Sequence, residues 1–160
     1  MLAMAYGHVY VAHIAFGAKD QQTLKAFVEA DAHPGPSIII AYSHCIAHGY
    51  ELSQGCNQQK LAVEAGAWPL YRFDPKRIPA GEPPLVLDSS PPKGSLREYM
   101  LNENRFRMVE KMDPKRFAML MEYAERDARR RTETYEQLAK LVVSAHGGTQ
   151  AAATTSEEAE

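Results

Sequence analysis

Cysteine is scarce in this sequence. Its 160 residues include only Cys45 and Cys56, which are not spaced as a Cys-x-x-Cys pair. This excludes a secreted disulfide framework and indicates a reducing cytoplasm. A large excess of either charge is missing too, since the formal net charge is −2. Binding to nucleic acid, which needs a basic surface, is therefore not expected.

Long apolar runs are also missing. No run approaches the roughly 20 apolar residues of a membrane-spanning helix, so no membrane association is expected. The apolar start has no basic leader and is interrupted by His8 and His13, which makes it a poor signal peptide. Core-type sequence begins almost at once, and this suggests a fold that starts before Met1. The sequence also has no glycine-rich phosphate loop and no Gly-Asp-Gly followed by Asn, the magnesium–diphosphate signature of thiamine enzymes.

The stretch 34–49 is the most informative part of the chain. A Pro-Gly-Pro turn precedes the apolar run 38–42, and Cys45 follows between His44 and His48. A short run rich in β-branched residues and bounded by turn signals predicts a strand buried on both faces. Ligands of open α/β sheets bind beyond the carboxyl ends of such strands, so Cys45 is the first candidate for chemistry.

A strand–helix–strand unit is predicted around this stretch. Residues 9–15 have the β-branched and aromatic content of a strand, and Asp20 is expected to cap a helix over 21–32. Leu24, Phe27 and Val28 share one face of that helix at i, i+3, i+4 spacing. The strand 38–42 then lies parallel to the first strand, joined by a right-handed crossover.

The middle of the chain is predicted to become less regular. A helix over 58–65 should stop at Gly66, and 68–73 should form a short strand with Pro69 at its entry or at a sheet edge. The proline-rich segment 74–94 predicts an extended arm, with room for a short paired stretch at 85–87.

Two helices are predicted after the arm. Ser95 and Glu98 form a capping box that begins a helix running to about residue 111. Asp113 and Pro114 begin a long amphipathic helix ended by glycines at 147–148. Its apolar stripe consists of Phe117, Leu120, Met121, Ala124, Ala128, Tyr135, Leu138 and Val142. The acidic tail 147–160 is expected to be disordered.

Cys45 permits several interpretations. It could be a buried structural cysteine, or a nucleophile with His44 or His48 as its base, although no strained elbow motif supports the latter. It could bind zinc with His44, His48 and Cys56, although this spacing matches no standard zinc pattern. It could also be one ligand of an iron–sulfur cluster, whose other thiolates would come from elsewhere. Trp68 and Tyr71 are expected in the core rather than at a cofactor.

Eight blocks of the sequence form a recognisable series: 6–12, 22–26, 34–37, 40–46, 59–63, 68–75, 87–89 and 102–106. In order and without large gaps, these blocks resemble the pyruvate:ferredoxin (flavodoxin) oxidoreductases. The resemblance covers about residues 1–142, and only the tail has no counterpart. Each block alone is weakly diagnostic, but together they are specific.

The resemblance implies an α/β fold and a function. The chain would be the carboxyl-terminal part of an enzyme that decarboxylates pyruvate on thiamine diphosphate and Mg²⁺. That enzyme passes electrons through three [4Fe–4S] clusters to ferredoxin or flavodoxin, and transfers the acetyl group to coenzyme A. By the match of 43–46, Cys45 would be the fourth ligand of the cluster nearest the thiamine. The full enzyme would be a cytoplasmic homodimer.

The resemblance also implies a division of the chain. Residues 1–73 would complete the thiamine diphosphate-binding domain as the carboxyl-terminal half of its parallel sheet. The arm 74–94, the terminal helices 95–146 and the tail 147–160 would follow. Three partner cysteines and the magnesium–diphosphate motif are absent, and Ala47 stands where many relatives have Asn. Two other hypotheses remain: a stand-alone interaction or remnant module with an exposed sheet edge, and a small zinc-binding protein.

Overall fold

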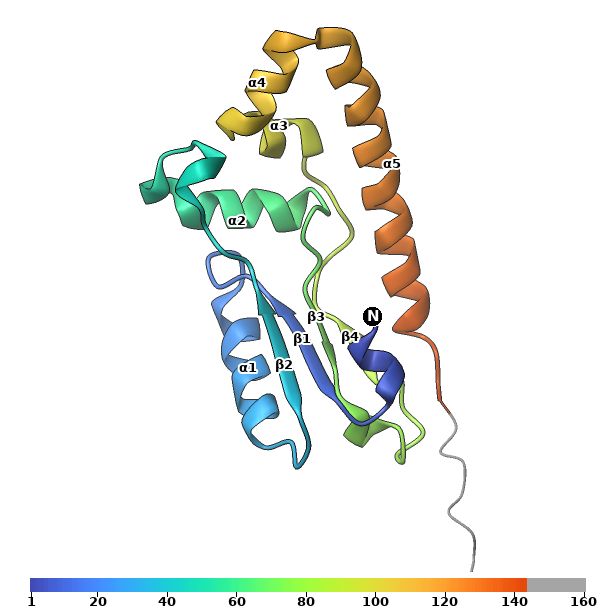
Figure 1. Cartoon of the computed structure of the whole chain (residues 1–160). Helices are drawn as coiled ribbons and strands as arrows, with labels where there is room; N and C mark the ends of the chain where they lie inside the picture. The colour runs from blue at the N-terminus through green and yellow to red at the C-terminus, as the bar shows by residue number, and fades with distance from the viewer. Residues whose placement is uncertain (144–160) are drawn as a thin grey trace, which may run out of the picture.

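A computed structural model describes residues 1–143 of the chain. It shows an α/β fold with one mixed, four-stranded sheet in the order β2-β1-β3-β4 (Figure 1). The strands are β1 (Tyr10–Ile14), β2 (Ser37–Ala41), β3 (Tyr71–Phe73) and β4 (Leu85–Leu87). Helix α1 (Asp20–Asp31) and the long helix α5 (Pro114–Leu138) lie on opposite sides of the sheet.

The remaining helices gather beyond the carboxyl ends of β1 and β2 (Figure 1). They are α2 (Gly55–Glu64), α3 (Leu96–Leu101) and α4 (Asn104–Met112). Residues 1–143 also contain four short 3₁₀ helices: η1 (Ala3–Tyr6), η2 (Ile46–His48), η3 (Leu52–Gln54) and η4 (Pro75–Arg77). Within residues 1–143, no helix is both long enough and apolar enough to span a bilayer.

The sheet is only partly parallel. The predicted unit is confirmed, because β1 and β2 pair in parallel with α1 as the crossover. However, β3 is antiparallel to both β1 and β4, so the prediction of a parallel sheet is wrong for two of its three strand pairings. The chain order explains why β3 is antiparallel to β1. Helix α2 lies beyond the carboxyl end of β1, so β3, which follows α2, enters the sheet at that end and runs in the opposite direction to β1. The short link between β3 and β4 holds no helical crossover, which parallel pairing requires.

Helix α1 packs on the sheet with the opposite face from the predicted one. Its buried residues are Gln22, Thr23 and Ala26. The predicted apolar face is exposed instead, at 67% for Leu24, 55% for Phe27 and 60% for Val28. The side chains buried between the helix and the strands are thus polar or small. The larger apolar residues of the helix lie on its outer side, and grouped exposed apolar residues of this kind are typical of a surface that a partner covers. The predicted cap is also displaced: α1 begins at Asp20, and Lys19 is its N-cap.

Strand β2 is present but is not buried. It forms one edge of the sheet, with only Ile39 packed against the cluster beneath α1. Ile38 is 43% exposed and Ile40 is 40% exposed, so the prediction of burial on both faces is wrong for this chain. The expectation of an exposed sheet edge is confirmed. Such an edge offers unpaired backbone groups to another strand.

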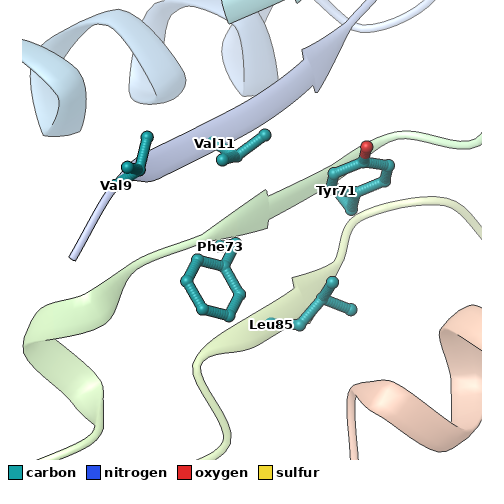
Figure 2. Close-up of a cluster of buried hydrophobic side chains, with 5 residues drawn as sticks. All are labelled: Val9, Val11, Tyr71, Phe73 and Leu85. Atoms are coloured by element: carbon teal, nitrogen blue, oxygen red, sulfur yellow. The ribbon is translucent and has the colours of Figure 1, made fainter. Parts of the chain in front are cut away.

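The best-buried core lies between the central strands and α5. Figure 2 shows its members on β3, on β4 and in or next to β1, where they face the carboxyl end of α5. Tyr135 and Leu138 of α5 pack against this cluster. The cluster consists of Val9, Val11, Tyr71, Phe73 and Leu85. The segment predicted as an extended arm therefore supplies an edge strand, β4, to the sheet.

A buried ion network joins the sheet to its surroundings. The guanidinium of Arg72 on β3 donates to both carboxylate oxygens of Asp88, at 2.8 and 2.9 Å, and to Glu29 on α1. The hydroxyl of Tyr10 donates to the same Glu29 at 2.9 Å. The hydrogen bond with Asp88 is the main reason that the pKa of Arg72 is raised. Burial of this arginine is tolerated because its charge is paired on both sides.

The helix ends follow the predicted capping residues in most places. The Ser95 hydroxyl accepts from the Glu98 N–H, and Asp113 accepts from the Arg116 N–H with Pro114 in the first turn. Gly66 follows α2 with a φ of 72°, the left-handed conformation that suits glycine after a helix.

The lengths of the terminal helices differ from the prediction. The helix expected over 96–111 is broken between α3 and α4 at Asn102–Glu103, and α5 ends at Leu138 instead of near 146. Of its predicted stripe, Phe117, Met121 and Ala128 are buried. The glycines at 147–148 and the tail 147–160 lie outside the described residues.

Candidate functional site

Cys45 lies just beyond the carboxyl end of β2, as predicted. It is the N-cap of η2 in extended conformation, and its side chain is exposed in this chain, so it is not part of the core of the described residues. The Tyr42 N–H donates to the Ile14 carbonyl at 3.0 Å and so continues the ladder with β1 past the end of the strand. The thiol is therefore presented beyond the carboxyl end of β2, the end of the strands at which ligands of open α/β sheets bind.

His44 braces this loop rather than offering a free nitrogen. The Gly17 N–H donates to Gln59 Oε1 at 2.8 Å, which orients the Gln59 amide so that its nitrogen donates to His44 Nε2 at 2.8 Å. Nε2 is then the acceptor, and Nδ1 carries the proton and donates to the Tyr50 hydroxyl. The ring also packs on Gly55, where an added Cβ would lie 2.7 Å from it. With Nδ1 protonated and Nε2 occupied, His44 fits neither a zinc ligand nor a base for Cys45.

The other predicted zinc ligands are not assembled around Cys45. Cys56 lies in the first turn of α2, and its Cα would be only 2.6 Å from a Cβ added to Gly17. Both cysteines are free thiols. Among residues 1–143, no group of three or more His, Cys, Asp or Glu side chains could hold a metal ion. The chain thus offers one exposed thiol at the site, which is compatible with a group held jointly with other residues.

The aromatic side chains near the loop belong to its supporting core. Trp68 stacks on His13 with 3.9 Å between ring centroids, and its indole N–H donates to the Ile14 carbonyl. Tyr71 is buried, as predicted. Burial is the main cause of the lowered pKa of His13 and of the raised pKa of Tyr42. These two groups are neutral at pH 7, so they support the loop without adding charge to it.

The far end of the loop rests on the terminal helices. The Gly49 carbonyl accepts from the Asn104 N–H at 3.1 Å. Gly49 has a φ of 70°, and a Cβ placed on it would lie 2.6 Å from the Asn104 Cβ. Sequence reasoning missed this contact, as well as Gln58 and Glu103 behind it. The block 102–106 in the family resemblance was the one available signal.

We expect Gly49→Ala to destabilise the chain more than Gly81→Ala. Both glycines have a φ of 70°, but Gly81 has no atom within 4 Å of an added Cβ. In each variant, alanine in the left-handed conformation lowers the free energy of unfolding by about 1–2 kcal/mol. In Gly49→Ala, the clash of the new Cβ with Asn104 lowers it by a further amount of about 1–3 kcal/mol. Urea unfolding of the two variants measures the difference. Equal losses of unfolding free energy would show that the loop does not depend on close contact with Asn104.

The chain was compared with models of protein families and with individual proteins. No family model matches it, but several individual proteins do. It is 58% identical over 138 residues to a pyruvate-flavodoxin oxidoreductase of Rhodospirillum rubrum and 52% identical over 139 residues to one of Nostoc sp.. It is 43% identical over 140 residues to the pyruvate:ferredoxin oxidoreductase of Moorella thermoacetica. The matches cover 86%, 87% and 88% of this chain but 12% of each relative.

These relatives are all oxidoreductases, and the chain is homologous to one segment of them. It belongs, as that segment, to the family of the pyruvate-flavodoxin and pyruvate:ferredoxin oxidoreductases. The chain spans 12% of the length of the relatives it matches, and most of each relative lies outside the match. The resemblance drawn from the sequence blocks is thereby confirmed.

Proposed function

We propose that this chain is the carboxyl-terminal segment of a pyruvate:ferredoxin (flavodoxin) oxidoreductase and supplies Cys45 as one ligand of a [4Fe–4S] cluster. The full enzyme would oxidise pyruvate to acetyl-CoA and pass the electrons through its clusters to ferredoxin or flavodoxin. The observation that carries this proposal is the exposed thiol of Cys45, held on a braced loop just beyond the end of β2.

The cysteines of this chain fit a cluster that is held together with other residues better than a cluster that is held by this chain alone. A [4Fe–4S] cluster requires about four thiolates and, when bound, carries electrons one at a time. Cys56 sits in the first turn of α2 against Gly17. Three thiolates would therefore come from residues outside this chain. An exposed ligand at a sheet edge suits this arrangement, since another segment can approach it there.

Thiamine diphosphate and Mg²⁺ are assigned to the remainder of the enzyme. The magnesium–diphosphate motif is absent from this sequence, and residues 1–143 hold no cluster of side chains suited to a metal. We propose that residues 1–73 complete the thiamine domain from its cluster side, with 74–94 and 95–146 bracing it. The coenzyme A site and the homodimer contacts also belong to the proposed full enzyme.

The surface that the remainder would cover is the outer face of α1 together with the β2 edge. The outer face of α1 exposes Leu24, Phe27 and Val28, and β2 exposes Ile38 and Ile40. The occupant we propose is the rest of the same oxidoreductase, because the relatives are much longer than the match. Its missing thiolates have to reach Cys45, which directly follows this edge.

A segment exchange tests the proposed function. The matched segment of the Rhodospirillum rubrum relative, which shares 58% identity, would be replaced by the corresponding residues of this chain in the full-length protein. We expect the chimera to keep its iron content and pyruvate-dependent reduction of flavodoxin, whereas deletion of the segment loses both. A chimera that folds but lacks one cluster would contradict the proposal. It would favour the stand-alone interaction module, which the exposed β2 edge also fits.

A further inference from the structure

Glu103 is a buried carboxylate that the proposed reaction does not use. It is 0% exposed, although it occupies the N-cap position between α3 and α4. A residue there commonly turns its side chain to the first N–H groups of the helix, but Glu103 makes no such bond. Its side chain points inward, where Oε1 accepts from Gln58 of α2 at 3.0 Å and Oε2 accepts from Arg105.

The same carboxylate faces the loop that carries Cys45. Glu103 Oε2 lies 3.9 Å from Nδ1 of His48, a buried atom that has no hydrogen-bond partner. The backbone N–H of His48 in turn donates to the Cys45 carbonyl at 3.0 Å. The neighbouring Asn104 N–H holds Gly49 at the end of the loop. The break between α3 and α4 therefore brings a charged side chain and a backbone donor to the back of the loop.

We propose that Glu103 is a positioning residue for Cys45, and that the Glu103–Arg105 pair sets the electrostatic surroundings of the group that Cys45 binds. Two observations carry this inference: the complete burial of the carboxylate and its contacts with α2, α4 and the loop. A fully buried carboxylate is costly unless it is paired, so its position is fixed by Gln58 and Arg105. The inference rests on the proposed role of Cys45 as a cluster ligand.

The two charges should shift the reduction potential in opposite directions. Reduction adds a negative charge, and the net charge around an iron–sulfur cluster is one determinant of its potential. Glu103→Gln keeps the shape but removes a negative charge, so the potential should become more positive. Arg105→Gln removes a positive charge and should make it more negative. The Arg105 side chain is 42% exposed, so its effect should be smaller than that of buried Glu103.

The test uses the full-length enzyme, with redox titration followed by electron paramagnetic resonance and with measured iron content. Glu110→Gln is the matched control, because Glu110 pairs with Arg97 at a partly exposed position on the same helix α4. The signal of the cluster that Cys45 binds is identified as the one that disappears from the spectrum of the Cys45→Ala enzyme. We expect opposite shifts of that signal in the Glu103 and Arg105 variants, unchanged potentials of the other clusters, and no shift in Glu110→Gln.

Each other outcome decides against the inference or against its premise. Equal shifts of all clusters, shifts of the same sign, or no shift would overturn the positioning role while leaving the function of Cys45 intact. If Glu103→Gln does not assemble, the sign in Arg105→Gln decides, and an unchanged or more positive potential overturns the inference. If Cys45→Ala retains every cluster signal, the proposed function itself fails.

Discussion

Full-length enzyme carrying Cys45→Ala is expected to lose one [4Fe–4S] cluster, a deficit of about four iron atoms per chain. Pyruvate-dependent reduction of flavodoxin should fall to background, since the path for single electrons is interrupted. An alanine side chain offers no atom that can replace a thiolate. The protein should still fold, because Cys45 is exposed in this chain and lies outside its buried core. Iron analysis and spectroscopy of the anaerobically purified variant measure the result.

Cys56→Ala is the matched control for this experiment. Cys56 is also an exposed free thiol, in the first turn of α2. Substitutions at exposed positions away from special features usually change stability by no more than about 0.5 kcal/mol. Iron content and activity should therefore stay at the wild-type level. A Cys45→Ala enzyme with a full set of clusters, or an equal iron loss in Cys56→Ala, would refute the assignment.

Local rules predicted the elements of this fold well. The β1–α1–β2 unit, the cap at Asp113, the first-turn position of Pro114 and the glycine after α2 are all confirmed. Each of these features depends on backbone geometry within a few residues. Such geometry can be read from sequence because turn residues, caps and β-branched runs act over short distances.

Features that depend on tertiary partners were not predictable in the same way. Apolar spacing marked one face of α1 for burial, but the face that packs on β1 and β2 carries Gln22 and Ala26 instead. The pattern still carried information, since an apolar outer face indicates a second packing partner. The break at Glu103 was missed because nothing local ends the helix there. The break places Glu103 against Gln58, a residue far away in the sequence.

The candidate site was predicted in its position but not in its support. The end of a β-branched run located Cys45 just beyond the carboxyl end of a strand, and the structure places it there, although that strand lies at the edge of the sheet and not inside it. The roles of the neighbouring histidines depended on long-range contacts. Gln59 orients His44, and Glu103 faces His48. Spacing alone left both histidines open as metal ligands, which the hydrogen bonds of His44 now argue against.

Phe27→Asp is expected to have little effect on this chain and a large effect on the full-length enzyme. In the chain alone, Phe27 is 55% exposed on the outer side of α1, so its unfolding free energy should change by less than about 0.5 kcal/mol. In the proposed enzyme the same side chain is covered by the rest of the polypeptide. The variant would lose apolar burial and bury an unpaired carboxylate, at a cost of about 2–4 kcal/mol. Urea unfolding of the chain and thermal unfolding of the enzyme measure the two effects.

Unfolding of the chain measures the effect of Phe27→Asp on α1 itself, and unfolding of the full-length enzyme adds its effect on the contact with the rest of the polypeptide. Gln21→Asp is the control, since it places the same acidic group on the same helix at a polar, exposed position four residues before Lys25. It should leave both the chain and the enzyme close to wild type. If Phe27→Asp is as mild as Gln21→Asp in the enzyme, the outer face of α1 faces solvent there and the proposed covering is wrong. A loss specific to Phe27→Asp in the enzyme would instead show why an apolar face, exposed in the chain, is present on α1: the full enzyme covers it.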